Sequence, residues 1–407
     1  MRTLSVFVNF VGMSSSLRAA RLATFAYFVL AGFVLGMWIV HIPAVEERAG
    51  LDHATLGWLL LLLGAGAFAG MRIVGPLTDR FGPRRVVPAS AVLCGGALVL
   101  PGLAVDAWTL GAALLVFGLA NGCLDVSMNT HAVQVERGYG RPVMSAFHAT
   151  FSIGGVFAAL IGAVILGRGW PPAATLAVVA VLAFAAALLA ATALLPPEAA
   201  PAADDDATDD AQPASRGRAN TRIRILAALA FMLMLCEGVA NDWSVLHLED
   251  VLGAPASTAA LAYGAFATTM TIGRFLADRV AGRLGPVAVL RYGSAIAAVG
   301  LTAAALSPSA PLALAGWAVL GVGLSGCVPQ LFSAAGHADP AAAGANVSRV
   351  AGLGYLGVLA GPAVIGPMTH LVPLNTAFFL PVAFCVIAAF TSGVLTTAEK
   401  KTLPEPA

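Results

Sequence analysis

Three polar side chains, Asn121, Asp125 and Asn129, recur at four-residue intervals in an otherwise apolar stretch of this sequence. In an α-helix this spacing places all three on one face. An ionisable group among apolar residues is costly inside a membrane, so it needs a polar partner, a water-filled cavity or a function. We interpret the stripe as the wall of a cavity. The alternative is that Asp125 only braces the inner end of a helix bundle, because it lies about 26–29 Å from the outer end of its helix.

A second polar group, Glu237, Asn241 and Asp242, precedes Trp243 in another apolar stretch. Glu237 and Asn241 share a helix face, and Glu237 lies about 20 Å along the helix from Arg224, near the middle of a membrane. A carboxylate at this depth either forms a permanent ion pair or gains and loses a proton. We favour proton coupling through Glu237, with Asp125 as the second candidate. We place Asn241 and Asp242 in the cavity wall, with Asp242 toward an outer gate.

Two further residues, His148 and Tyr355, are candidates for the same cavity. Histidine titrates near neutral pH and can both donate and accept a hydrogen bond. A lone histidine is, however, more often a structural residue than a functional one. Tyr355 follows Asn346, Ser348 and Arg349 in a later apolar stretch that is unusually rich in polar groups.

The sequence holds no constellation that would catalyse a reaction. We find no catalytic pair of carboxylates, nucleophile elbow, phosphate-binding loop or metal-ligand cluster, so we predict no enzyme activity and no cofactor. Residues 321–326 match a dinucleotide-binding pattern letter for letter. They lie inside an apolar stretch and follow no strand, so close packing or local helix bending is the better interpretation.

These residues lie on long apolar segments that need a membrane. Of the 407 residues, 59% are hydrophobic and only 11% are charged, whereas soluble domains carry about 25% charged residues. The net charge of +1 gives no electrostatic reason to bind nucleic acid. A bilayer is spanned by about 20 apolar residues. Twelve such segments are present, at roughly 22–43, 55–77, 86–105, 108–131, 143–166, 172–195, 224–247, 257–277, 287–306, 312–334, 345–368 and 373–396.

The segment 196–221 divides the twelve spans into two equal sets. It is rich in proline, alanine and aspartate, and such a composition cannot bury a core. We therefore predict an all-α membrane protein with a six-helix bundle over 1–195, a disordered cytoplasmic linker over 196–221 and a second six-helix bundle over 222–407.

The orientation follows from the basic residues, which favour the cytoplasmic side. With both termini inside, sixteen lysines and arginines fall on the inner side, while Arg48 and Arg168 fall outside. All six tryptophans fall near outer ends of spans, where amphipathic rings prefer to lie. We expect a monomeric multi-pass protein of the cytoplasmic membrane with both termini in the cytoplasm.

A charged turn, GPLTDRFGPRR, occupies positions 75–85 between two apolar spans. A less complete copy of this motif follows in the second half, where Asp278 and Arg279 repeat Asp79 and Arg80 at a separation of 199 positions. A repeat at this distance indicates an internal duplication.

The first copy, G-x-L-x-D-R-x-G-x-R-R, resembles the signature loop between helices 2 and 3 of the major facilitator superfamily of transporters. The resemblance covers essentially the whole chain. It implies two pseudo-symmetric bundles around a central cavity and transport by alternating access. In that family helices 1, 4, 7 and 10 line the cavity, which implies that Trp38 and Gln330 join the cavity residues given above.

The resemblance also implies a gate at the inner end. In that family the loop aspartate, here Asp79, holds the gate against helix 11, and the loop arginines meet an acidic residue of helix 4, here Glu136 or Asp125. Arg349 would either pair with Asp79 across the interface between the halves or extend to water. The second copy lacks the Pro-Arg-Arg ending, so the resemblance is weaker evidence that Asp278 forms a latch, that is, a contact that holds the two halves together at the inner end. The residues assigned to this gate are Gly75, Asp79, Arg80, Gly82, Arg84, Glu136, Asp278, Arg279 and Arg349.

Three segments carry a narrower resemblance: NGCLDVSMN at 121–129, RPVMSAFH at 141–148 and EGVANDW at 237–243. They are similar to a bacterial branch of the superfamily, the MosC-like group, which is named for a rhizopine-associated membrane protein and is distantly akin to fucose permeases. Most members have no assigned substrate, so this resemblance indicates a subfamily and no cargo.

We therefore expect a secondary transporter of a small polar organic solute that is coupled to protons. Efflux of amphipathic drugs is the main alternative, although a drug cavity would be mostly aromatic and apolar. A transporter-like receptor that moves no solute is another alternative.

The basic residues generate a prediction about topology. Reporter fusions at Gln212 and at the C-terminus should both report a cytoplasmic location, because sixteen of the eighteen basic residues outside the spans lie on that side. Fusions to alkaline phosphatase, which is active outside the cytoplasm, and to green fluorescent protein, which fluoresces in the cytoplasm, measure the location of each site. A periplasmic signal from either fusion would contradict the twelve-span arrangement.

Overall fold

The computed structural model describes residues 2–51, 53–196 and 213–396, which form helices joined by short turns and contain no β-strand. The first half of the chain contributes α1 (Arg2–Ala49), α2 (His53–Phe81), α3 (Pro83–Ala97), α4 (Val99–Leu103), α5 (Ala107–Tyr139), α6 (Met144–Gly167) and α7 (Pro172–Ala191). The second half contributes α8 (Pro213–Leu246), η1 (His247–Val251), α9 (Ala256–Leu284), α10 (Pro286–Ala305), α11 (Ala310–Leu324), α12 (Cys327–Ala338), η2 (Pro340–Ala342), α13 (Ala343–Met368), α14 (Leu374–Ala377), α15 (Phe379–Thr391) and η3 (Ser392–Leu395).

The helices are apolar and long enough to cross a membrane. Within the described residues, eleven segments meet this description by length and composition. Every predicted span except 257–277 corresponds to one of them; that span lies in α9, which is also long enough to cross a bilayer but carries Arg274, Asp278 and several threonines. The predicted all-α membrane architecture is therefore confirmed.

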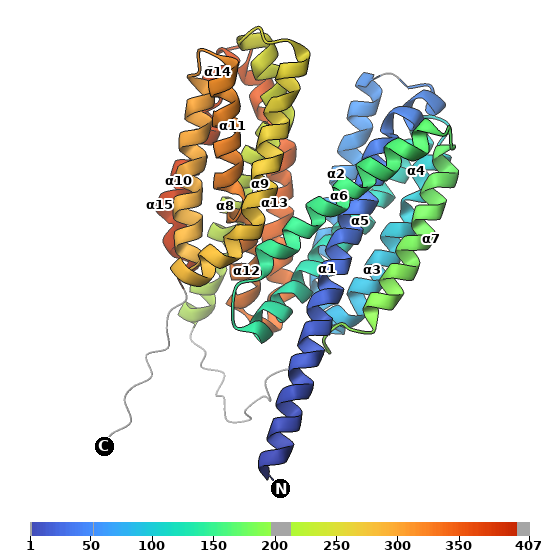
Figure 1. Ribbon diagram of the computed structural model, residues 1–407, viewed down its shortest axis with the longest axis vertical. Coiled ribbons are helices and arrows are strands. Elements are labelled where there is room, and N and C mark those ends of the chain that lie inside the picture. The colour runs from blue at the N-terminus through green and yellow to red at the C-terminus, as the bar shows by residue number, and fades with distance from the viewer. Residues whose placement is uncertain (1, 52, 197–212, 397–407) are drawn as a thin grey trace.

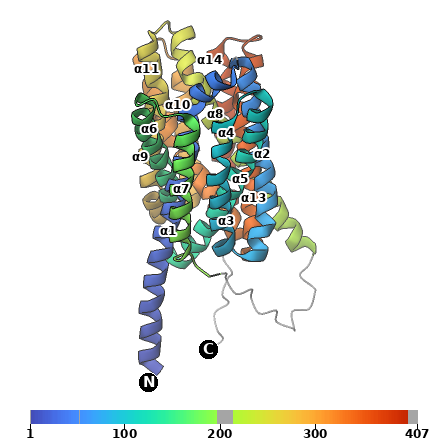
Figure 2. The same ribbon diagram turned by 90° about the vertical axis from the view of Figure 1, so that its right-hand side faces the viewer.

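The helices gather in two groups, α1–α7 and α8–η3, seen as blue to green and yellow to red in Figure 1. The ribbons of the two groups draw together at one end and diverge toward the other, and Figure 2 shows the first group from its outer side. We call the end where they meet the closed end. The residues on either side of the segment 197–212 and the end of η3 lie there, and the start of α1 projects beyond this end, as expected for an even number of spans in each half.

Helices within each half approach closely where glycine replaces larger residues. In the first half, Gly118 and Gly122 of α5 lie against the backbone of α2 at Leu63 and Ala67. In the second half, Gly357 of α13 lies against the backbone of α8 at Phe231. Without competition from water, such close backbone contacts are a main source of helix association in a membrane. They bind each half into one packed unit.

Two details differ from or refine the sequence interpretation. Helix α8 begins at Pro213, so the last part of the predicted linker is helical, while residues 197–212 lie outside the described residues. The glycine-rich segment 321–326 serves both packing and bending. Gly321 lies against the backbone of α9 at Phe266, and the helix breaks between α11 and α12 at Ser325 and Gly326.

The glycine contacts generate a prediction about stability. Gly118→Ala should lower the thermal unfolding midpoint in detergent, because the added methyl group would overlap the carbonyl oxygen of Leu63 and force α2 and α5 apart. Overpacking of this kind costs about 1–3 kcal/mol. Gly264→Ala is the matched control, since a methyl group at Gly264 of α9 meets no atom within 4 Å. Equal midpoints for the two variants would contradict this account of helix packing.

Candidate functional site

A cavity of about 120 Å³ lies between the two halves, near the middle of their length. We call it the central cavity. Its polar lining groups are Asp125 of α5, His148 of α6, Glu237 of α8, Arg274 of α9 and Tyr355 of α13. Asp125 lies eleven residues before Glu136, a closed-end residue described below, which places the cavity about 16 Å from that end.

Glu237 and Arg274 form an ion pair in the central cavity. The Glu237 Oε1 atom lies 3.4 Å from Nη2 of Arg274, and the two side chains are 23% and 14% exposed. The Nη1 atom of Arg274 donates a hydrogen bond of 3.0 Å to the Ser152 hydroxyl of α6. Arg274 therefore joins a carboxylate of its own half to a hydroxyl of the other half.

Asp125 has a different environment from Glu237. Its side chain is buried, and its Oδ2 atom has no hydrogen-bond partner within the described residues. Its other oxygen lies 3.4 Å from the Asn129 amide, whose Oδ1 lies 3.1 Å from Nε2 of His148. The Asn129 nitrogen also donates to the Asp125 carbonyl at 2.9 Å. Asp125 thus presents a carboxylate oxygen that can still accept a proton or a donor group.

Aromatic rings complete the cavity. His148 lies edge-on between Phe28 of α1, at 5.3 Å between ring centroids, and Phe332 of α12, at 5.8 Å. Phe151 lines the same space. The cavity therefore combines hydrogen-bonding groups with apolar surface, which is the usual composition of a small-molecule site.

The remaining predicted cavity residues lie elsewhere. Asn121 is buried one turn from Asp125, and Asn241 and Asp242 are exposed beyond Glu237, away from the closed end. Trp38 is fully buried, with its ring 6.5 Å from Phe117 of α5 in the core of the first half. Gln330 lines a second cavity at the closed end, while Val328 and Phe332 of the same helix line the central cavity.

Asp79 joins the two halves at the closed end through hydrogen bonds to the start of a helix in the other half. Its two carboxylate oxygens accept hydrogen bonds from the backbone N–H groups of Gly344, at 2.6 Å, and Ala345, at 2.9 Å, in the first turn of α13. These N–H groups have no partner within their own helix, and the helix dipole favours a negative charge there. Gly75, one turn earlier on α2, leaves room for Ser348 of α13.

Asp278 repeats this arrangement from the second half. Its oxygens accept from the backbone N–H groups of Ser145, at 2.9 Å, and Ala146, at 2.8 Å, in the first turn of α6. The two contacts are related by the internal duplication, since Asp278 stands 199 positions after Asp79. The missing Pro-Arg-Arg ending therefore does not prevent the second copy from forming a latch in this structure.

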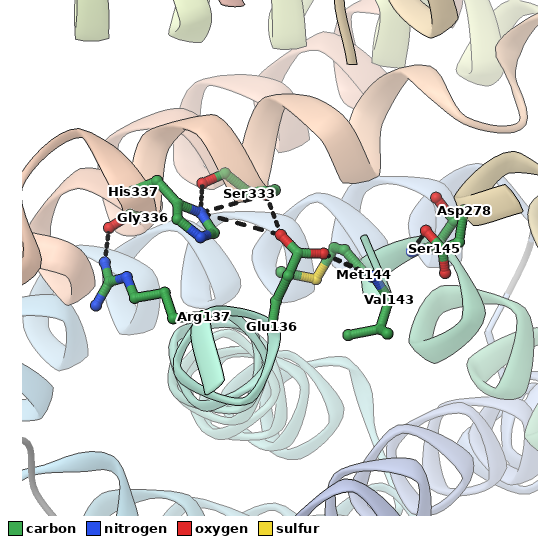
Figure 3. A network of polar contacts seen from close by, with 9 residues as sticks. All are labelled: Glu136, Arg137, Val143, Met144, Ser145, Asp278, Ser333, Gly336 and His337. Carbon is green, nitrogen blue, oxygen red and sulfur yellow. Dashed lines mark hydrogen bonds and ion pairs between the residues drawn. The ribbon is translucent and has the colours of Figure 1, made fainter. Parts of the chain in front are cut away.

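Glu136 and Arg137 form a third connection at the closed end (Figure 3). The buried Glu136 carboxylate accepts from the Ser333 hydroxyl of α12 through Oε1 and from the Val143 and Met144 N–H groups, at 2.9 and 3.0 Å, through Oε2. Arg137 donates to the Gly336 carbonyl of α12, and His337 lies 4.0 Å from Glu136. The resemblance implied that Glu136 contacts the arginines of the loop at 75–85. In the structure Glu136 instead contacts α12 and the start of α6.

The other predicted gate residues surround these contacts. Gly82 adopts φ 78° in the turn between α2 and α3, a conformation that glycine adopts without strain. Arg80, Arg84 and Arg279 are exposed at this end. Arg349 is exposed and lies 3.4 Å from the Asn346 side chain, while backbone N–H groups hold Asp79.

Several residues of the site were not singled out from the sequence. Arg274 was readable only as a basic residue in a span, and its link to Glu237 is a tertiary contact. Ser152, Ser333 and His337 carried no signal, because serine is common in membrane helices and histidine alone indicates no role. The backbone donors of α6 and α13 have no side-chain signature.

Comparisons with known proteins agree on one family. The family model described as "Major Facilitator Superfamily" matches residues 22–362. An uncharacterized MFS-type transporter of Yersinia pestis is 37% identical over 354 residues, covering 86% of this chain and 89% of that protein. The membrane protein MosC of Rhizobium meliloti is 32% identical over 384 residues, covering 93% and 90%.

A solved structure supports the same fold. The crystal structure of the E. coli fucose:proton symporter FucP superposes with a TM-score of 0.73 at 15% identity, covering 93% of this chain and 98% of that one. At this identity the similarity speaks for the arrangement of the helices alone.

The latch geometry generates a prediction about the closed end. Asp79→Asn should increase the reactivity of a cysteine placed at Ser145, which is fully buried at the contact between the halves. Asparagine keeps the shape but loses the charge that favours the helix start, worth up to about 2 kcal/mol, so we expect labelling to rise by up to about thirtyfold. The measurement is the rate of maleimide labelling of Ser145→Cys with and without the second substitution.

Asp106→Asn is the matched control. Asp106 also accepts a backbone N–H, that of Thr109 at 2.8 Å, but it does so at the exposed start of α5, away from the closed end. This contact holds the pKa of the Asp106 carboxyl below its ordinary value, so the aspartate is charged here too. A similar increase in labelling from both substitutions would mean that the Asp79 contact does not specifically hold the closed end shut.

Proposed function

The chain belongs to the major facilitator superfamily, and from this membership and the central cavity we propose a secondary active transporter that moves a small polar organic solute by alternating access, coupled to protons. Membership makes the chain a multi-pass membrane transporter and not an enzyme. The observation that carries the finer proposal is the central cavity, whose charged and hydrogen-bonding walls come from both halves.

Alternating access needs one end of the cavity to close while the other opens. The contacts of Asp79, Asp278, Glu136 and Arg137 join the halves at the closed end. They are hydrogen bonds at the interface between the halves, so they can be exchanged as the halves rock. This arrangement supports a carrier whose cavity is sealed from the side of the closed end in the present state.

Proton coupling is supported by the neighbours of Glu237. An adjacent cation favours an ionised carboxylate, and burial without such a cation favours the protonated form. Arg274 and Asp278 lie one turn apart on α9, and they bond to Ser152 and Ser145 of α6. Movement that breaks the Asp278 contact must also disturb the Arg274 contact. The charge next to Glu237 would therefore depend on whether the closed end is shut.

The cargo follows from the same walls. Asp125, Glu237, Arg274, His148 and Tyr355 offer donors and acceptors for hydroxyl, amine or carboxylate groups. The phenylalanine rings offer an apolar surface for the carbon skeleton. We therefore propose a compact solute with several polar groups, in preference to an amphipathic drug.

The remaining elements of the proposal concern the cell. We place the protein as a monomer in the cytoplasmic membrane, with the closed end and both chain termini facing the cytoplasm, and we assign it no nucleic-acid partner. The excess of basic residues at that end supports this orientation. The first experiment is a thermal-shift screen of the purified protein at two pH values against sugars, polyols, amines and drugs.

The coupling assignment is tested by Glu237→Gln in proteoliposomes with the best solute from that screen. Glutamine keeps the shape and hydrogen bonding of the side chain but cannot ionise. We expect uptake driven by a pH gradient to fall to background, while counterflow exchange of labelled solute persists. Asp250→Asn, an exposed carboxylate after the same helix, should leave both activities unchanged.

A double variant separates coupling from a structural ion pair. If Glu237 only neutralises Arg274, then Glu237→Gln with Arg274→Gln should restore gradient-driven uptake. If Glu237 carries the proton, the double variant should remain uncoupled. Survival of both activities in Glu237→Gln together with loss of both in Asp125→Asn would transfer the role to Asp125. Gradient-driven uptake that survives both single substitutions would rule out proton coupling through either residue.

A further inference from the structure

A second and larger cavity, of about 420 Å³, lies at the closed end between the halves. We call it the basal cavity. The first half supplies Arg137 and Arg141, and the second half supplies Arg222, Gln330, Ser333 and His337. Its volume falls in the range of about 300–1,000 Å³ that is typical of small-ligand sites.

The basal cavity carries an excess of positive charge. Three guanidinium groups line it, and Glu136 is the one acidic side chain among its lining residues. Both oxygens of Glu136 already accept hydrogen bonds, from Ser333 and from the backbone N–H groups of Val143 and Met144. With three guanidinium groups against this one carboxylate, the lining of the cavity keeps a net positive charge.

Contacts at the rim hold the guanidinium groups in place. Arg222 donates to the carbonyl oxygens of Val394, at 3.1 Å, and Leu395, at 3.5 Å. Arg137 donates to the Gly336 carbonyl, and Arg141 stacks over the Tyr139 ring at 5.7 Å. Arginines that are positioned before binding lose less conformational freedom when a ligand arrives.

An unpartnered donor is the second and independent observation. Gln330 is only 4% exposed, and its Nε2 atom makes no hydrogen bond within the described residues. A buried amide without an acceptor is unfavourable and usually marks a missing partner. Gln330 lines the basal cavity, and a rotation of its side chain would bring the amide to an acceptor bound there.

We propose that the basal cavity binds a phosphate-bearing anion. Guanidinium groups match phosphate oxygens in paired, charge-assisted hydrogen bonds, and the Gln330 amide supplies a further donor. The phosphate belongs either to a soluble cytoplasmic anion or to the headgroup of an anionic lipid, and the two sources share this chemistry.

Binding has a consequence for the conformation. The walls of the basal cavity come from both halves, so the complete site exists only while the closed end is shut. A ligand that binds one state shifts the population toward it. The anion therefore favours the present state, and this inference depends on neither the cargo nor the coupling ion of the proposed function.

The test measures thermal unfolding of the full chain in phosphatidylcholine nanodiscs with added pyrophosphate, against potassium chloride at equal ionic strength. We expect pyrophosphate to raise the unfolding midpoint of the natural protein. Arg141→Gln together with Arg222→Gln should remove most of this rise. Arg283→Gln is the matched control, because Arg283 is exposed at the end of α9 and does not line the cavity.

Nanodiscs that contain phosphatidylglycerol distinguish the source of the phosphate. If this lipid alone raises the midpoint and pyrophosphate adds nothing, the ligand is a lipid headgroup. If pyrophosphate acts and the lipid does not, the ligand is a soluble anion. The site is overturned if neither probe raises the midpoint, or if the double variant and Arg283→Gln respond as the natural protein does.

A labelling measurement tests the effect on conformation. The probe that stabilises the protein should slow maleimide labelling of Ser145→Cys several-fold, and the double arginine variant should abolish this slowing. The five natural cysteines are buried, which limits background labelling. Stabilisation without slower labelling would overturn the link between the basal cavity and the closed state.

Discussion

The structure depends on one interaction that occurs twice: a carboxylate of one half accepts the free backbone N–H groups at the start of a helix in the other half. Asp79 holds α13 in this way and Asp278 holds α6. Because the donors belong to the first turn of each helix, the contact fixes both position and direction. It brings α6 against α9 and α2 against α13, and these pairs enclose the central cavity from the closed end.

The central cavity is connected to this latch through a single helix. Helix α9 carries Asp278 and Arg274 one turn apart, and both contact α6. The same arginine neutralises Glu237. The ion pair of the central cavity and the Asp278 contact at the closed end therefore lie on the same face of α9. Asp125 lies opposite in the first half, with a carboxylate oxygen that has no partner of its own.

Much of this arrangement could be predicted from the sequence, because a membrane makes strong demands on composition. Long apolar segments and the repeated Asp-Arg pair indicated the helices and the duplication. Carboxylates inside spans indicated Asp125 and Glu237 as cavity residues. The partners could not be predicted in the same way. Arg274 reaches Glu237 from another helix, Gln330 lines the basal cavity and not the central one, and the latches use backbone donors that any residue except proline supplies.

The basal cavity is built from both halves, and this has a consequence for inhibition. A compound that fills it from the side of the closed end would hold the two halves together there and keep the carrier from changing state. It would not compete with cargo, since the central cavity lies on the other side of the closed contact. Raising the solute concentration would therefore not relieve the block, and the maximal rate would fall while the apparent affinity for cargo from the far side would increase.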